Sequence, residues 1–213
     1  MFNKLAQLFR VSSKAKSDKA YRRITFGFML GGAIAALGAA FILTLEKFHL
    51  YEDPNAVLSC SINVVLNCST VMQSWQSHVF GFPNMLIGLV AFPVLITIAT
   101  LGLSGVKFPR WFLIAASIAL FLGTLFAYWL FFQSLYAIQV LCPWCLIVTT
   151  SMTIMFSSFL HFNLKEGTFK LKTALDKPIQ RFLAGGYHQM VVLSWIALMV
   201  VLVILKFGEA LFA

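Results

Sequence analysis

The sequence is poor in charge, and poorest in acidic charge. Only 11% of its 213 residues are Asp, Glu, Lys or Arg, and only seven of these are acidic. A soluble globular domain carries about 25% charged residues, so an ordinary soluble enzyme is excluded, as are a disordered chain and a coiled coil. With 60% hydrophobic residues, the remaining class is an all-α polytopic membrane protein.

The sequence contains long segments without charged residues. A bilayer core about 30 Å thick needs about 20 apolar residues per helix. The uncharged run between Arg110 and Lys165 is too long to cross once, so we expect it to fold back at 133–141, a more polar stretch before Pro143. The sequence therefore predicts five spans, near 24–45, 84–103, 111–132, 142–162 and 187–205.

The net charge of +9 follows the predicted topology. Fourteen of the sixteen Lys and Arg residues lie in 1–23, 104–110 and 163–186, which all fall on one side of the membrane. The positive-inside rule makes that side cytoplasmic and places the 46–83 loop outside. Anionic lipid headgroups then account for the basic charge, and no nucleic-acid partner is expected. The first span is too long for a signal peptide h-region of about 7–15 residues, so we expect it to be retained.

The chain has only four cysteines, and all of them fall on the predicted outer side. Cys60 and Cys68 lie in the 46–83 loop, whereas Cys142 and Cys145 open the fourth span. Paired cysteines on an oxidising face indicate disulfide chemistry. A Cys-x-x-Cys pair at a helix start also gains thiolate stabilisation from free N–H groups and the helix dipole. Simple packing and a four-thiolate zinc centre are the alternatives, but the Cys-x7-Cys spacing is long for zinc, so no metal site is predicted.

The second half of the outer loop has helical periodicity. From Asn67 or Ser69 onward, Val71, Trp75 and Val79 recur at a spacing of four, and Gln76 faces elsewhere. This predicts a short amphipathic helix on the membrane surface that carries Cys68 at its start, as a lid over the membrane domain.

Taken together, these motifs resemble the vitamin K epoxide reductase family, and its bacterial members most. The resemblance covers about residues 20–165, and it implies a four-helix catalytic bundle. It divides the chain into a basic segment 1–23, a redox domain 24–162, a cytoplasmic linker 163–186 and a fifth helix with a short tail, 187–213. The motifs that carry it are Cys60-x7-Cys68, Phe80-Gly81-Phe82-Pro83-Asn84 and Cys142-Pro143-Trp144-Cys145.

The resemblance implies an electron relay in a bacterial inner membrane that supports disulfide bond formation. No thioredoxin-like domain follows the bundle, so a separate thioredoxin-fold protein is expected to reduce the loop disulfide, first at Cys60. Cys68 then attacks Cys142, and Cys145 faces a bound quinone, either ubiquinone or menaquinone.

Four further residues are candidates for the quinone site. Asn84 matches a family asparagine that hydrogen-bonds a quinone carbonyl, although asparagine is also a good N-cap. Ser74 matches a family serine near the active site, or is an ordinary polar residue. Thr149 stands where vertebrate members have a substrate-contacting tyrosine, so a respiratory quinone is expected rather than vitamin K epoxide, with Thr149 as a small donor. Trp144 is expected to shield the site from water, or to anchor the interface.

Two rival interpretations remain open. A non-catalytic scaffold or small transporter would hold static Cys60–Cys68 and Cys142–Cys145 bonds; a channel or carrier usually has an intramembrane charge, and the predicted spans have none. The disulfide bond formation protein B type has its two cysteine motifs in the reverse order.

Overall fold

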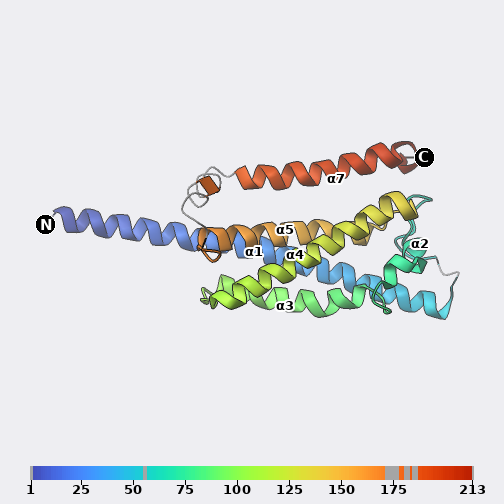
Figure 1. The fold of residues 1–213 in the computed structure, drawn as a ribbon, viewed down its shortest axis with the longest axis horizontal. Coiled ribbons are helices and arrows are strands. Elements are labelled where there is room, and N and C mark those ends of the chain that lie inside the picture. Colours follow the sequence, from blue (N-terminus) through green and yellow to red (C-terminus); the bar gives the residue numbers. More distant parts are fainter. Residues whose placement is uncertain (1, 55–56, 171–177, 180–182, 184–186, 213) are drawn as a thin grey trace.

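The computed structural model describes residues 2–54, 57–170, 178–179, 183 and 187–212. Within these residues the only regular structure besides helix is one isolated β-bridge. In the described part of the chain, five helices are long and apolar enough to cross a membrane. The predicted class, an all-α polytopic membrane protein, is therefore confirmed (Figure 1).

The helices follow the predicted spans with some differences at their ends. The five long helices are α1 (Phe2–Glu52), α3 (Met85–Leu103), α4 (Arg110–Phe132), α5 (Pro143–Lys165) and α7 (Tyr187–Phe212). Three short elements lie near one end of the bundle: α2 (Cys68–Gln73), the 3₁₀-helix η1 (Trp75–His78) and the π-helix η2 (Gln133–Ile138).

The first helix is longer than the predicted span of 24–45. Its candidate membrane-spanning part is Lys19–Glu52, which at 1.5 Å per residue measures about 50 Å and exceeds the bilayer core. The helix ends two residues before Pro54, because proline disfavours helical geometry in the residue that precedes it. The last turns of α1 therefore extend beyond the apolar run and lie beside the loop.

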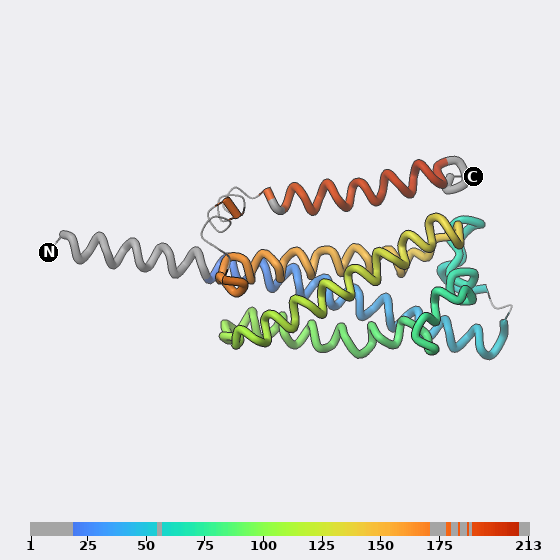
Figure 2. The backbone as a smooth tube through the Cα atoms, viewed as in Figure 1, coloured from blue at the N-terminus to red at the C-terminus, as the bar shows by residue number. Residues whose placement is uncertain are grey.

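Four helices form the bundle, and α1 is its centre. α1 packs against both α3 and α5, and α4 packs against α5, whereas α7 lies beside α5 with fewer contacts (Figures 1 and 2). The chain turns back between α4 and α5 where predicted. There η2 is followed by Gln139, whose φ of 58° is left-handed. The core of the bundle is built from the buried side chains of Phe26, Met29, Leu120, Met155 and Phe159.

A hydrogen-bond chain connects α7 to the bundle. Thr153 Oγ1 donates to the carbonyl of Thr149 at 2.9 Å, so the only proton of the Thr153 hydroxyl is already used in that hydrogen bond. Tyr128 must therefore donate its hydroxyl proton to Thr153 Oγ1, and it accepts a hydrogen bond from Trp195 Nε1 at 2.8 Å. Such polar contacts substitute for the hydrophobic effect between helices in lipid. Much of the predicted 163–186 linker lies outside the described residues.

The contact between α1 and α3 depends on a glycine. The ring of Phe26 lies so close to Gly102 that a Cβ on Gly102 would be 2.4 Å from Phe26 Cδ1. Arg22 closes the same contact, because its guanidinium donates to the carbonyls of Gly102, at 3.3 Å, and Val106, at 2.9 Å.

We predict that Gly102→Ala destabilises the protein by about 1–3 kcal/mol, because an overpacked core must shift to relieve the clash. Gly38→Ala is the matched control, since nothing lies within 4 Å of a Cβ at that helical position. The measurement is thermal unfolding of both variants in detergent. Equal unfolding temperatures for the two variants would show that the Phe26 contact is not tight.

Candidate redox site

The loop is joined to the start of α5 by backbone pairing. Leu66 and Leu141 form a parallel β-bridge: the N–H of Leu141 donates to the carbonyl of Val65 at 2.7 Å, and the N–H of Asn67 donates to the carbonyl of Leu141 at 3.0 Å. Cys68 follows directly on one side of this bridge, and Cys142 follows directly on the other. The pairing therefore brings two cysteines that are 74 residues apart in the chain together.

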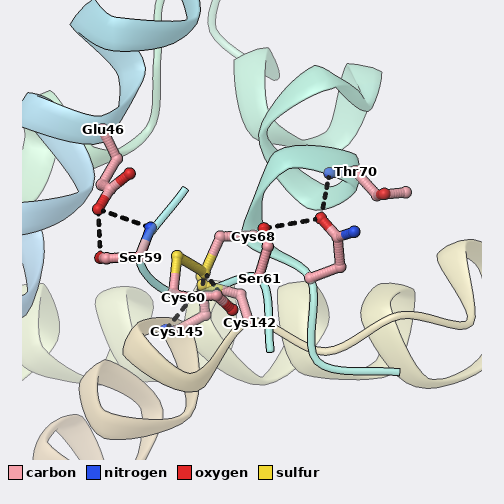
Figure 3. Close-up of a disulfide and its surroundings, with 9 residues drawn as sticks. Glu46, Ser59, Cys60, Ser61, Cys68, Thr70, Cys142 and Cys145 are labelled. Atoms are coloured by element: carbon pink, nitrogen blue, oxygen red, sulfur yellow. Dashed lines mark hydrogen bonds between the residues drawn. A yellow bond between two sulfur atoms is a disulfide. The ribbon is translucent and has the colours of Figure 1, made fainter. Parts of the chain in front are cut away.

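The four cysteines form one cluster, with one disulfide and two thiols. Cys60 and Cys68 are bonded, with their Cα atoms 5.6 Å apart, whereas Cys142 and Cys145 are free. The sulfur of Cys68 lies 3.4 Å from the sulfur of Cys142 (Figure 3). Among the described residues no three His, Cys, Asp or Glu are grouped as metal ligands. A thiol in contact with a disulfide sulfur is the arrangement that thiol–disulfide exchange requires.

Cys142 is placed to carry negative charge. It is the N-cap of α5, and its sulfur accepts the backbone N–H of Cys145 at 3.4 Å. A hydrogen bond from the Cys145 side chain lowers the pKa of Cys142, burial opposes this, and the backbone N–H groups of Cys145 and Trp144 lower the pKa further. Pro143 fits the first helical position because proline needs no hydrogen bond there.

The predicted amphipathic helix over 67–79 is wrong as a single element. Asn67 caps α2, with its Oδ1 accepting the N–H of Thr70 at 3.2 Å, and Cys68 begins the helix. Ser74, however, is extended, with ψ of 152°, and its hydroxyl donates to the carbonyl of Val71 at 2.7 Å. The chain restarts there as η1, so Val71 is buried while Trp75 is 67% exposed.

A cavity of about 200 Å³ lies inside the four-helix bundle, against the Cys142–Cys145 pair. Side chains of α1, α3, α4 and α5 contribute to its wall, and most of them are apolar. Its polar lining comes from Ser74, Gln76, Ser77, Asn84, Ser134 and Thr149. A mostly apolar cavity with a few converging polar groups is typical of a small-molecule site.

Asn84 lies at the N-cap position of α3, but its side chain makes no capping hydrogen bond. The capping alternative is therefore wrong. Its Nδ2 instead donates to the carbonyl of Gln76 at 2.7 Å, and its buried Oδ1 has no partner within the described part of the chain. One N–H and one carbonyl oxygen of this amide thus remain for a molecule in the cavity, since an amide carries two donors and an acceptor.

The other three candidates differ from one another in position. Ser74 and Thr149 line the cavity, whereas Trp144 lies outside its lining and packs against the buried cluster that includes Leu58 and the cysteines. The expected role of Trp144 as a shield of the quinone site stays a prediction. Thr149 Oγ1 donates to the carbonyl of Cys145 at 2.9 Å, so it presents an acceptor to the cavity, not the expected donor.

Gln76 is a site residue that the sequence pattern missed. It is buried, its carbonyl holds Asn84, and its Nε2 donates to Gln133 Oε1 at 3.3 Å. The sequence prediction assumed one unbroken helix, and in such a helix Gln76 faces away from Val71 and Trp75. The interruption at Ser74 changes the phase of the following turn, and no local sequence signal reports the contact with Gln133.

The comparisons with known proteins give one match. The family model described as Vitamin K epoxide reductase family matches residues 28–160, which include both cysteine pairs and the lining of the cavity. No curated protein and no solved structure matches the chain.

We predict that Cys145→Ala raises the pKa of Cys142, because the Cys145 side chain is the largest cause of its lowering. The measurement is thiolate absorbance against pH in a Cys60→Ala, Cys68→Ala background, where only the Cys142–Cys145 pair can ionise. Trp144→Phe, which keeps its backbone N–H, is the control and should leave the first ionisation unchanged. An unchanged titration in Cys145→Ala would contradict the assigned cause.

Proposed function

Because the chain belongs to the vitamin K epoxide reductase family, we propose that it is a membrane thiol–disulfide oxidoreductase. In this proposal it oxidises a thioredoxin-fold partner and passes the electrons to a quinone, which supports disulfide bond formation. The observation that carries the proposal is the 3.4 Å contact between the sulfurs of Cys68 and Cys142, because it joins the loop pair to the pair beside the cavity.

The relay consists of exchanges that balance in bonds and electrons. A partner thiolate attacks Cys60, the Cys60–Cys68 bond breaks, and a second partner thiol resolves the mixed disulfide, which leaves two loop thiols. Cys68 then attacks Cys142 of an oxidised Cys142–Cys145 pair, and Cys145 leaves as the thiolate. Attack of Cys60 on Cys68 finally releases Cys142. The bonding in the structure, an oxidised loop beside a reduced Cys142–Cys145 pair, matches the product of this internal transfer.

The cavity fits a quinone ring. Its wall is mostly apolar, Cys142 and Cys145 lie in that wall, and Asn84 offers an unused N–H beside an unpartnered carbonyl oxygen. A bound quinone supplies an acceptor for two electrons and two protons. Asn84 would orient it by donating to a ring carbonyl, and Ser74 and Thr149 complete the polar wall. A cavity among membrane helices suits a lipid-soluble acceptor such as ubiquinone or menaquinone.

The distribution of charge supports an orientation for the relay. Most Lys and Arg residues lie in the N-terminal segment and in the links 104–110 and 163–186, so the N-terminus is assigned to the cytoplasm. The loop and its cysteines then face the oxidising side of a bacterial inner membrane. This is where a thioredoxin-fold partner that oxidises secreted proteins would meet the loop.

The rival scaffold function is less well supported. A scaffold stapled by static disulfides requires both cysteine pairs to be bonded, whereas Cys142 and Cys145 are free and Cys142 touches the loop disulfide. Structural disulfides would not require the sulfur of Cys142 to contact the loop disulfide, so the electron relay is better supported.

The proposal predicts quinol formation when the purified protein is mixed with a reduced thioredoxin-fold protein and a quinone. Cys145→Ala should form no quinol, because it cannot form the Cys142–Cys145 disulfide. It should contain a Cys68–Cys142 bond, formed when the Cys142 thiolate attacks Cys68 and Cys60 leaves as a thiol, since Cys145 is no longer present to attack Cys142 and free Cys68. Peptide mapping after acid quench and alkylation identifies the bond.

Cys142→Ala is the control, and only the Cys60–Cys68 bond should be found in it. The relay is wrong if Cys145→Ala shows only the bonds of the parent protein.

Asn84→Ala should raise the KM for quinone about tenfold, because a lost hydrogen bond of about 1.4 kcal/mol weakens binding by that factor. Exchange between Cys68 and Cys142 should continue, since Asn84 does not touch the loop disulfide. Thr97→Ala on the exposed face of the same helix is the matched control. Unchanged quinone kinetics in Asn84→Ala would remove Asn84 from the binding site.

A further inference from the structure

Two consecutive charged residues are buried at the end of α1 that lies beside the loop. Glu46 and Lys47 are each only 8% exposed, although Glu and Lys are almost never buried unless they are paired. Desolvating a charge costs several kcal/mol unless hydrogen bonds compensate for it. The compensation for both residues comes from the loop.

Glu46 holds the segment that carries Cys60. One oxygen of its carboxylate accepts the backbone N–H of Ser59 at 3.3 Å and also the Ser59 hydroxyl (Figure 3). Ser59 directly precedes Cys60, so these two charge-assisted hydrogen bonds fix the backbone next to that sulfur.

Lys47 holds the segment that carries Cys68. Its Nζ donates to the carbonyl of Met72 at 3.0 Å and lies 5.0 Å from the centre of the Tyr51 ring. The Met72 carbonyl is in the last turn of α2, where the dipole is negative, and it accepts the Ser77 hydroxyl at 2.7 Å as well as the Lys47 ammonium. Cys68 is the first residue of the same helix, so a cation at the far end of α2 fixes the position of Cys68.

These contacts matter most when the disulfide is open. In the oxidised loop the Cys60–Cys68 bond itself holds the two segments together. Reduction removes that bond, and Cys68 must then remain beside Cys142 while Cys60 remains within reach of Cys68. The contacts of Glu46 and Lys47 do not involve the sulfurs, so reduction leaves them intact.

We propose that Glu46 and Lys47 are positioning residues that hold the Cys60 and Cys68 segments in place while the loop is reduced. The role in electron transfer rests on the proposed function, but the clamp itself does not. Holding two thiols near each other raises their effective concentration, which favours the closed disulfide. The clamp therefore has an effect that can be measured without a quinone or a partner.

The test is the equilibrium between the loop thiols and glutathione in a Cys142→Ala, Cys145→Ala background. There, two loop thiols and one oxidised glutathione give the Cys60–Cys68 disulfide and two reduced glutathiones. Glu46→Ala and Lys47→Met should each lower the equilibrium constant about tenfold, since each frees one cysteine segment. Glu46→Gln and Lys47→Arg should recover most of the loss. Glu52→Ala, at the exposed end of α1, is the matched control.

An unchanged equilibrium constant in both Glu46→Ala and Lys47→Met would overturn the clamp. So would an equal loss in Glu52→Ala, which would indicate a general effect of acidic charge or helix stability.

Turnover separates the clamp from the proposed function. In the protein with all four cysteines, Glu46→Ala should slow quinol formation driven by the thioredoxin-fold protein about tenfold. With Cys60 and Cys68 both changed to Ala, quinol formation driven by dithiothreitol should be the same with and without Glu46→Ala. Equal losses in both assays would overturn the positioning role, because damage would then extend to the cavity. If the parent protein forms no quinol in either assay, the proposed function fails, and the glutathione equilibrium still decides the clamp.

Discussion

The arrangement of the redox site depends on the backbone pairing of the loop with Leu141. Two main-chain hydrogen bonds, from Leu141 to Val65 and from Asn67 to Leu141, fix the register between the loop and the start of α5. Since one cysteine follows each paired segment, the register itself sets the 3.4 Å approach of Cys68 to Cys142. A side-chain contact alone could rotate away, whereas a backbone pairing places both Cα atoms. Shifting the pairing by one residue would move Cys68 away from its position beside Cys142.

The start of α5 divides the site into two compartments. On one side Cys142 packs with the loop disulfide and with the buried apolar side chains around that disulfide. On the other side Cys142 and Cys145 form part of the cavity wall, with Asn84 and Thr149. A pair of thiols at this boundary can exchange with the loop and still reach a molecule in the membrane. The hydroxyls nearby on α5 donate to carbonyls one turn earlier, so they do not compete for the sulfurs.

The sequence predicted what depends on composition and on short spacing. The five spans, the turn between the third and fourth of them and the family follow from uncharged runs and from motifs such as Cys142–Cys145. What the sequence could not predict depends on contacts between distant residues. The break at Ser74, the contact of Gln76 with Gln133 and the bridge at Leu141 all arise when the loop folds onto the bundle. In the sequence, Glu46 and Lys47 resemble ordinary charged residues at a membrane interface. Their burial becomes evident only in the folded structure, where the loop covers them.

Burial of the loop disulfide agrees with the redox state in which it is found. Cys60, Cys68 and Cys142 are all at least 95% buried, which slows the approach of external thiols and disulfides. In the proposed relay, this bonding state follows the internal transfer, when two electrons reside on Cys142 and Cys145. An outside disulfide that reached those thiols would divert the electrons from the cavity, so exclusion at this stage is useful. Access is needed only later, when the oxidised loop meets a new partner. Contacts that hold the loop segments without using the sulfurs, such as those of Glu46 and Lys47, can keep both cysteine segments in place while the disulfide opens and closes.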